Sequence, residues 1–158
     1  MNRQLEPLVL QSPSYVKDTN NFLNNLKDMG RFLKGAILVT IDVIGLHPHI
    51  PHNEGWAAIR KILNTRTSPE IPTDEIVDLA ELVLRNNNLE FNDKHFLQKR
   101  GTAIGRRMAP AYANIFMPDL ETKLLDLAPV KPYVWLRYSD DIFIIWTAGE
   151  EKLHDFLQ

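Results

Sequence analysis

The segment that most constrains this chain is LRYSDDIFIIW, residues 136–146 of 158. Two apolar, aromatic-rich runs flank an adjacent pair of acids, a pattern that predicts two strands joined by a tight hairpin turn. Asp140 and Asp141 are expected at the tip of that hairpin. Because neighbouring like charges repel, such a tip is favoured when a cation such as Mg²⁺ or Mn²⁺ neutralises it. For this segment alone, a solvated turn is the simpler interpretation.

A third acid ends an apolar run far upstream. Residues 36–42, AILVTID, are short, apolar and β-branched up to Asp42, as expected of a buried central strand. An acid at the end of such a strand is able to face the acids of the hairpin. This pairing would turn a commonplace Asp-Asp turn into a cluster of carboxylates.

A glycine-containing loop lies between these two segments. Residues 101–114, GTAIGRRMAPAYAN, predict a loop that runs into a helix, with two arginines at the junction. Glycine permits close approach of the backbone to a ligand, and helix-start amides beside arginine favour phosphate. Neither a Walker nor a dinucleotide fingerprint is present. Strand acid, loop and hairpin acids together fit a two-metal site for phosphoryl transfer.

The order of the three segments resembles motifs A, B and C of a reverse transcriptase palm. In detail, LVTIDVIGLHPHIPHNEG, KRGTAIGRRMAPAYANIFM and WLRYSDDIFIIW resemble the Penelope-like class of retroelement reverse transcriptases, and the resemblance extends over residues 5–157. It implies an α+β fold: a reverse-transcriptase palm with an antiparallel sheet, helices packed on one face, incomplete fingers and no thumb. Residues 1–158 would form one partial reverse transcriptase domain, with a fingers–palm junction at 1–35 and the palm at 36–158.

The resemblance also implies an activity, RNA-directed DNA polymerisation by two-metal transfer of a nucleotide to a primer 3′-hydroxyl. Its partners would be an RNA template, a DNA primer and deoxynucleoside triphosphates, and its cofactors two Mg²⁺ (or Mn²⁺) ions. The implied catalytic and metal-binding residues are Asp42, Asp140 and Asp141, with Val43 as a backbone metal ligand. Asp141 is the weaker direct ligand, because adjacent residues of a hairpin do not point the same way.

Further residues are assigned by their places in the motifs. Those implied to contact the nucleotide are His47, Ile104, Gly105, Arg106, Ala109, Pro110 and Tyr138, and those implied to contact nucleic acid are Lys99, Arg100 and Arg107. His47 stands where most reverse transcriptases have a Tyr or Phe that excludes a ribose 2′-hydroxyl. Ile104 stands where many polymerases have Gln, although Penelope-like relatives also carry an apolar residue there.

Composition narrows the function classes. A formal net charge of −2 excludes a global basic field for nucleic acid, so contacts must come from local basic residues. The absence of cysteine excludes disulfides and thiolate metal sites and fits an intracellular protein. No apolar run is long enough for a membrane span, and the first residues do not form a secretory signal.

The chain is expected to be a fragment. Its start resembles a point after the basic fingers strands, and its end lies in what resembles the next palm helix. Fingers, thumb and a possible GIY-YIG endonuclease would then lie outside it. Two alternatives stay open: an inactive remnant or nucleic-acid-binding module with the palm fold, and another palm enzyme such as an RNA polymerase or nucleotide cyclase. The latter explains the acids but not GTAIGRRMAPAYAN.

The remaining segments predict mostly helices. Helices are expected over residues 18–29, after a cap at Asn53, after a cap at Thr73, and after the glycine loop, where Pro118 would shorten the helix. In the helix after Thr73, the residues expected to face the core are Ile76, Leu79, Ala80, Val83 and Leu84. A small hairpin should turn at Asn92-Asp93. Three histidines, His47, His49 and His52, lack a zinc-ligand pattern, and Trp135 and Trp146 are expected in the core.

Overall fold

The computed structural model describes residues 2–31, 34–103 and 105–158. The chain divides into two compact units, one formed by Met1–Gln11 and Gly45–Asp119 and the other by Ser12–Ile44 and Leu120–Gln158. The second unit carries the sheet and all three acids of the predicted site. The first carries most of the helices and the glycine loop.

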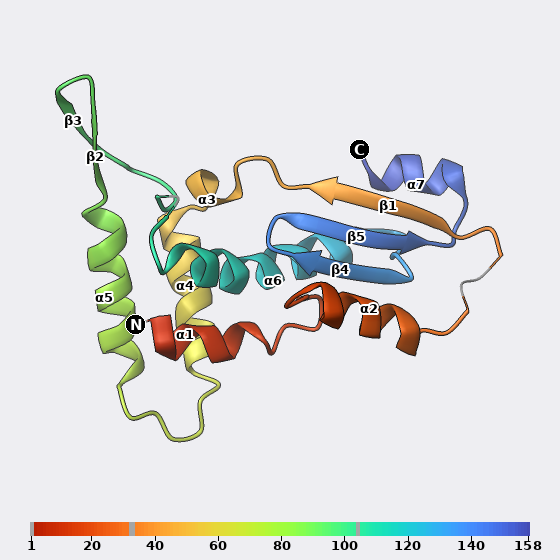
Figure 1. The fold of residues 1–158 in the computed structure, drawn as a ribbon, viewed down its shortest axis with the longest axis horizontal. Coiled ribbons are helices and arrows are strands. Elements are labelled where there is room, and N and C mark those ends of the chain that lie inside the picture. Colours follow the sequence, from red (N-terminus) through yellow and green to blue (C-terminus); the bar gives the residue numbers. More distant parts are fainter. Residues whose placement is uncertain (1, 32–33, 104) are drawn as a thin grey trace. The chain divides into compact units, whose positions relative to one another are not determined.

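The sheet of the second unit is antiparallel and has the order β1-β5-β4, with β1 at Ile37–Asp42, β4 at Val134–Tyr138 and β5 at Asp141–Trp146 (Figure 1). The prediction of β1 as a buried central strand is wrong, because β1 lies at an edge of this sheet. Its residues alternate between half-buried and exposed, and the side chain of Leu38 is 59% exposed. An apolar, β-branched run fits an edge strand as well as a central one, since it reports strand propensity and not the number of neighbours.

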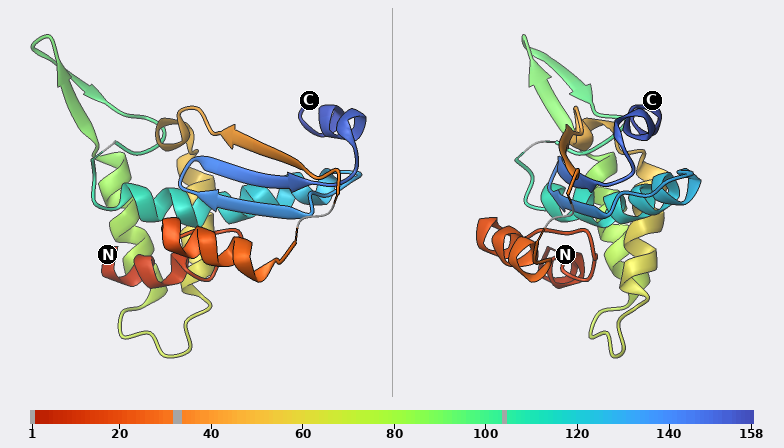
Figure 2. Two further views of the ribbon diagram at one scale, coloured as in Figure 1. Left: turned by 45° about the vertical axis from the view of Figure 1, so that its right-hand side comes forward. Right: turned by 90° about the vertical axis from the view of Figure 1, so that its right-hand side faces the viewer.

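Helices pack on both faces of this sheet. One face carries Val134, Leu136 and Ile145, which pack with Phe22 of α2 (Thr19–Asp28). The ring of Phe22 also meets that of Phe143 edge to face, with 5.1 Å between the ring centroids. The other face buries Ile142, Ile144, Trp146 and Leu153 of α7 (Glu150–Phe156). Figure 2 shows α2 and α7 on opposite sides of the sheet. The α+β class with an antiparallel sheet is confirmed, although the resemblance implied helices on one face only.

The helix predicted over residues 18–29 is confirmed as α2 with its two capping residues. Asp18 precedes the helix in extended conformation, and its Oδ1 accepts a hydrogen bond of 2.8 Å from the Asn21 amide. That bond satisfies one of the amides that a helix start leaves without a partner. Gly30 follows the helix with a φ of 72°, a conformation that glycine adopts without steric cost. These two residues set where the helix begins and ends.

The first unit is mainly helical. It contains α1 (Asn2–Val9), α3 (Leu46–His49), α4 (His52–Leu63), α5 (Thr73–Arg85) and the first part of α6 (Ala109–Leu127). Its fully buried large side chains include Leu5, Ile50, Ile59, Leu63, Ile76, Leu84 and Tyr112. None of the helices that the structure describes is both long and apolar enough to cross a membrane.

Two predicted caps in this unit are wrong. The N-cap of α4 is Pro51 and not Asn53, and that of α5 is Pro72 and not Thr73, neither with a side-chain bond to the helix. The prolines end extended linkers, because their fixed φ suits both an extended link and a helix entry. On α5, Leu79 is 49% exposed while Val77 is buried, so the buried stripe differs from the predicted one.

The small hairpin forms as predicted. Its strands are β2 (Asn88–Phe91) and β3 (Lys94–Leu97), and both turn residues have positive φ, 52° at Asn92 and 59° at Asp93. Two positive φ values define a type I′ turn, whose twist matches that of the flanking strands. Phe91 is 72% exposed at the end of β2.

Pro118 does not shorten α6, contrary to expectation. The helix is 19 residues long and continues past the proline to Leu127. A proline inside a helix costs about 3 kcal/mol, because it removes one hydrogen bond and crowds the preceding turn. The helix offsets this cost by burying apolar side chains on several sides around the proline: Ala111, Tyr112, Ala113, Ile115, Phe116 and Met117. Burial of that extent is not visible in the local sequence.

Candidate catalytic site

Two carboxylates face each other across the β1–β5 ladder. The register pairs Ile41 with Ile142 and Asp42 with Asp141. The next pair along is hydrogen-bonded, since the Val43 amide donates to the Asp140 carbonyl oxygen at 3.0 Å. Hydrogen-bonded and non-hydrogen-bonded pairs alternate, so Asp42 and Asp141 form a non-hydrogen-bonded pair, in which side chains lie closest, with Cβ atoms about 4.5–5.5 Å apart. Both acids are exposed on the same face.

The turn between β4 and β5 has an unusual backbone. Tyr138 pairs with Asp141, which leaves Ser139 and Asp140 as a two-residue loop. Ser139 has a φ of 55°, whereas Asp140 does not have a positive φ. Positive φ at the first loop residue only is the pattern of a type II′ turn, where glycine is usual. A non-glycine residue held there stores strain on the order of 1–3 kcal/mol.

The three predicted acids therefore differ in position. Asp141 lies opposite Asp42 on one face, although the sequence argument ranked it as the weaker ligand. Asp140 lies in the turn, so its direction depends on the turn conformation. In the described part of the chain, no group of three His, Asp or Glu side chains is arranged to hold a metal ion. An opposed carboxylate pair nevertheless fits Mg²⁺ or Mn²⁺, because Mg²⁺ is often held by one or two carboxylates together with waters and substrate phosphates.

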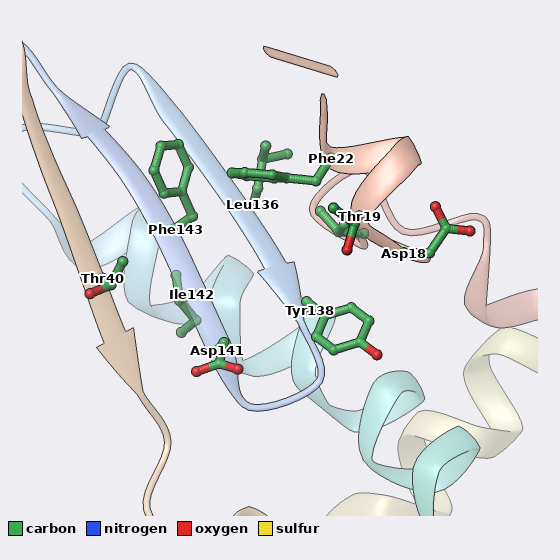
Figure 3. Close-up of a pocket in the computed structure, with 10 residues that line it drawn as sticks. Asp18, Thr19, Phe22, Thr40, Leu136, Tyr138, Asp141, Ile142 and Phe143 are labelled. Carbon is green, nitrogen blue, oxygen red and sulfur yellow. The ribbon is translucent and has the colours of Figure 1, made fainter. Parts of the chain in front are cut away.

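A pocket of about 530 Å³ opens on the face that carries Asp141 (Figure 3). Tyr138 and Asp141 lie at the turn end of the pocket, and Phe22 and Leu136 form part of its apolar wall. The remaining lining residues are Val16, Asp18, Thr19, Thr40, Ile142 and Phe143. Sequence reasoning did not identify Thr40 as a lining residue, although its place two residues before Asp42 puts it on the same face of the strand.

A buried charged network lies behind the turn, and sequence reasoning missed it. Arg137 is fully buried, and its Nε donates to Glu121 Oε1 at 2.6 Å. The Ser14 hydroxyl donates to Glu121 Oε2 at 2.5 Å, and Arg137 Nη1 donates to the Ser139 carbonyl oxygen at 3.0 Å. The signal in the sequence was an arginine inside an otherwise apolar strand. Such a residue is buried only when it is paired.

The predicted motif B residues belong to the first unit. Gly101 has a φ of 68°, and a Cβ there would overlap the backbone of His47 and Pro48, so its missing side chain accommodates protein and not a ligand. Gly105 has a φ of 93°, and an added Cβ would meet no described residue other than its chain neighbours within 4 Å. Arg106 Nη2 donates to Asn87 Oδ1 at 3.2 Å. Ala109 is buried and Pro110 exposed, whereas Ile104 lies outside the described residues. The basic residues Lys99, Arg100 and Arg107 are exposed.

The rings of His49 and His52 bond to backbone carbonyl oxygens. His49 Nδ1 lies 2.6 Å from the Gly45 carbonyl oxygen, and His52 Nε2 lies 2.8 Å from that of Gly101. His47 accepts a bond of 2.9 Å from the Thr102 amide at its carbonyl oxygen. Its buried Nδ1 has no hydrogen-bond partner among the described residues. These contacts tie the segment after motif A to the glycine loop within one unit.

No protein-family model and no curated protein sequence matches this chain. Several solved structures do. Apo telomerase from Candida tropicalis, truncated from its C-terminal domain, matches with a TM-score of 0.72 and 17% identity, over 99% of this chain and 36% of that one. Apo telomerase from Candida tropicalis matches with a TM-score of 0.69 and 16% identity, over 97% and 30%.

Telomerase from Candida albicans, in complex with a TWJ fragment of telomeric RNA, matches with a TM-score of 0.72 and 9% identity, over 99% of this chain and 30% of that one. This chain therefore spans about a third of the length of these proteins. At such identities the likeness establishes the fold alone. That fold is a reverse-transcriptase-like palm.

Proposed function

We propose that this chain is a reverse transcriptase domain, of the Penelope-like class, that performs RNA-directed DNA synthesis. The observation that carries the proposal is the opposed pair of Asp42 and Asp141 beside the strained Ser139–Asp140 turn. Like charges directly opposite each other on a sheet are destabilising, so their presence favours a role that requires them. The class rests on the three sequence motifs alone, and the fold supports the broader reverse-transcriptase-like palm.

Divalent metal is proposed at this pair. Asp42, Asp141 and Asp140 would supply carboxylate oxygens, and Val43 a backbone oxygen, to Mg²⁺ or Mn²⁺. When bound, two such ions would promote deprotonation of the primer 3′-hydroxyl and neutralise charge on the triphosphate. The chain's own contribution is positional, since the β1–β5 register holds Asp42 and Asp141 at a fixed separation before any ligand arrives.

Template, primer and nucleotide contacts are proposed from the motifs. Tyr138 is 54% exposed beside Asp141 and presents an aromatic face to a sugar or base. Gly105, Arg106, Ala109, Pro110 and Ile104 are proposed nucleotide contacts because of their places in motif B. The exposed Lys99, Arg100 and Arg107 are proposed contacts to nucleic acid phosphates. His47 is proposed to select the sugar.

Primer extension tests this function. The assay uses the protein as its gene encodes it, an RNA template, a DNA primer, deoxynucleotides and Mg²⁺ or Mn²⁺. Asp42→Asn and Asp141→Asn are expected to reduce extension to background while the protein still binds the primer–template. The matched control is Asp93→Asn, an exposed acid in the β2–β3 turn, which should leave extension unchanged. Extension that persists in both site variants would contradict the proposal.

A second candidate is a nucleic-acid-binding module that retains the palm without turnover. The observation in its favour is that Lys99, Arg100 and Arg107 are exposed, so that they are open to nucleic acid phosphates whether or not metal binds. This candidate predicts primer–template binding that is independent of Asp42 and Asp141, and no extension under any metal condition. The same assay therefore separates the two.

A further inference from the structure

The Ser139–Asp140 peptide can adopt two orientations in a two-residue turn. Types I′ and II′ differ by a flip of this central peptide, which moves the second residue between positive and negative φ. Here the second residue is Asp140, without a positive φ, and the oxygen that changes sides in a flip is that of Ser139. The direction of the Asp140 carboxylate thus depends on which way one carbonyl group points.

Arg137 holds that carbonyl group. Its Nη1 donates to the Ser139 oxygen at 3.0 Å, while its Nε is fixed by Glu121 at 2.6 Å. A guanidinium is planar, so anchoring one edge on a carboxylate sets the direction of its other donors. A flip of the central peptide would remove this acceptor from a buried donor, which is costly.

The anchor of Arg137 is itself fixed from several sides. Glu121 is held by the Ser14 hydroxyl, and the Arg137 amide donates to the Ser14 carbonyl oxygen at 2.7 Å. The Val16 amide donates to the Arg137 carbonyl oxygen at 2.8 Å, so the segment around Tyr15 adds to the outer edge of β4. Since buried ion pairs are weak contributors to stability compared with apolar replacements, fixing a geometry is the better explanation for this one.

We propose that Arg137 is a positioning residue that locks the Ser139–Asp140 peptide in the type II′ orientation and thereby aims the Asp140 carboxylate. Its value to catalysis rests on the proposed function. The bond from the Val43 amide holds the peptide that follows Asp140. The network of Arg137, Glu121 and Ser14 supplies the constraint on the Ser139–Asp140 peptide that precedes it.

The test uses Arg137→Lys, which keeps a charge for Glu121 but lacks the fork that reaches two acceptors. One readout is cross-relaxation between the amide protons of Ser139 and Asp140, which is weak in a type II′ turn and strong after a flip to type I′. The other is Mn²⁺ affinity by calorimetry. In Arg137→Lys the amide signal should strengthen and the affinity should fall about tenfold or more, as for a lost supporting shell of a metal site.

A rescue variant separates aiming from general damage. Adding Ser139→Gly to Arg137→Lys should restore the type II′ signal and the Mn²⁺ affinity, because glycine favours that turn at its first position. Arg85→Lys, in an exposed ion pair with Glu81, is the matched control and should change neither readout. Should Arg137→Lys not fold, the apolar pair Arg137→Met with Glu121→Leu serves with the same readouts.

An unchanged amide signal in a folded Arg137 variant would overturn the inference. So would a loss of Mn²⁺ affinity that Ser139→Gly does not restore. If the native chain bound no Mn²⁺, the proposed metal site would be wrong, but the amide signal would still decide whether Arg137 sets the turn.

Discussion

The like-charge pair of Asp42 and Asp141 should destabilise the metal-free protein. Both acids are exposed and directly opposite on one face of the sheet. For carboxylate charges about 6 Å apart in water, the Coulomb repulsion is about 0.7 kcal/mol. Asp42→Asn and Asp141→Asn should therefore each raise the free energy of unfolding by about 0.7 kcal/mol.

A double-mutant cycle isolates this repulsion. Once either acid is neutralised the repulsion is gone, so the double variant should gain no more than either single one. The assay is urea unfolding of the four proteins followed by circular dichroism, repeated at 1 M NaCl, where a screening length of about 3 Å should remove most of the gain. Additive gains, or a gain that salt does not reduce, would refute the charge argument.

Binding of Mn²⁺ should reverse the order of stability of the native chain and the two single variants. If the site binds with a Kd near 1 mM, then 10 mM Mn²⁺ stabilises the native chain by about 1.4 kcal/mol, from the linkage relation. The single variants should gain much less, so they become the less stable proteins. If Mn²⁺ shifts the unfolding midpoint of the variants as far as that of the native chain, the result would contradict a metal site at this pair.

Three further changes test other features. Gly55→Ala should lower the free energy of unfolding in urea by about 1–3 kcal/mol, because a Cβ there would overlap the Tyr112 ring. Helix propensity alone would favour alanine by about 1 kcal/mol, so a more stable variant would contradict this packing. Asp93→Gly should stabilise by up to about 1 kcal/mol by relieving its φ of 59°, and an unchanged midpoint would argue against the type I′ turn. If His47 selects the sugar, His47→Tyr in an active protein should reject ribonucleotides about tenfold better, since a clash or hydrogen bond is worth about 1–3 kcal/mol, whereas equal incorporation ratios would exclude the role.

Local chemistry was predictable from the sequence where few residues decide it. Asp18 and Gly30 delimit α2 as expected, and Asn92-Asp93 forms the expected hairpin turn. The strand pair around the acids also follows from composition alone. In each case the deciding interaction lies within a few residues of the chain, so a short window of sequence contains the whole argument.

Features that depend on distant partners were not predictable. The edge position of β1 depends on which strands pair, and the course of α6 through Pro118 depends on burial around the helix. The choice of Asp141 as the partner of Asp42 follows from register, since a shift of one residue would exchange the two hairpin acids. The role of Arg137 was not visible in the strand sequence, because its ion-pair partner Glu121 lies on α6.

Paramagnetic broadening by Mn²⁺ tests the central claim most directly, since it maps bound metal onto individual residues of the native chain. Substoichiometric Mn²⁺ should first broaden the amide signals around Asp42, Val43 and the Ser139–Asp141 turn, and Asp42→Asn should abolish that pattern. Broadening that instead centres on other surface acids, such as Glu150 and Glu151, and persists in Asp42→Asn would contradict a metal site at the opposed aspartates.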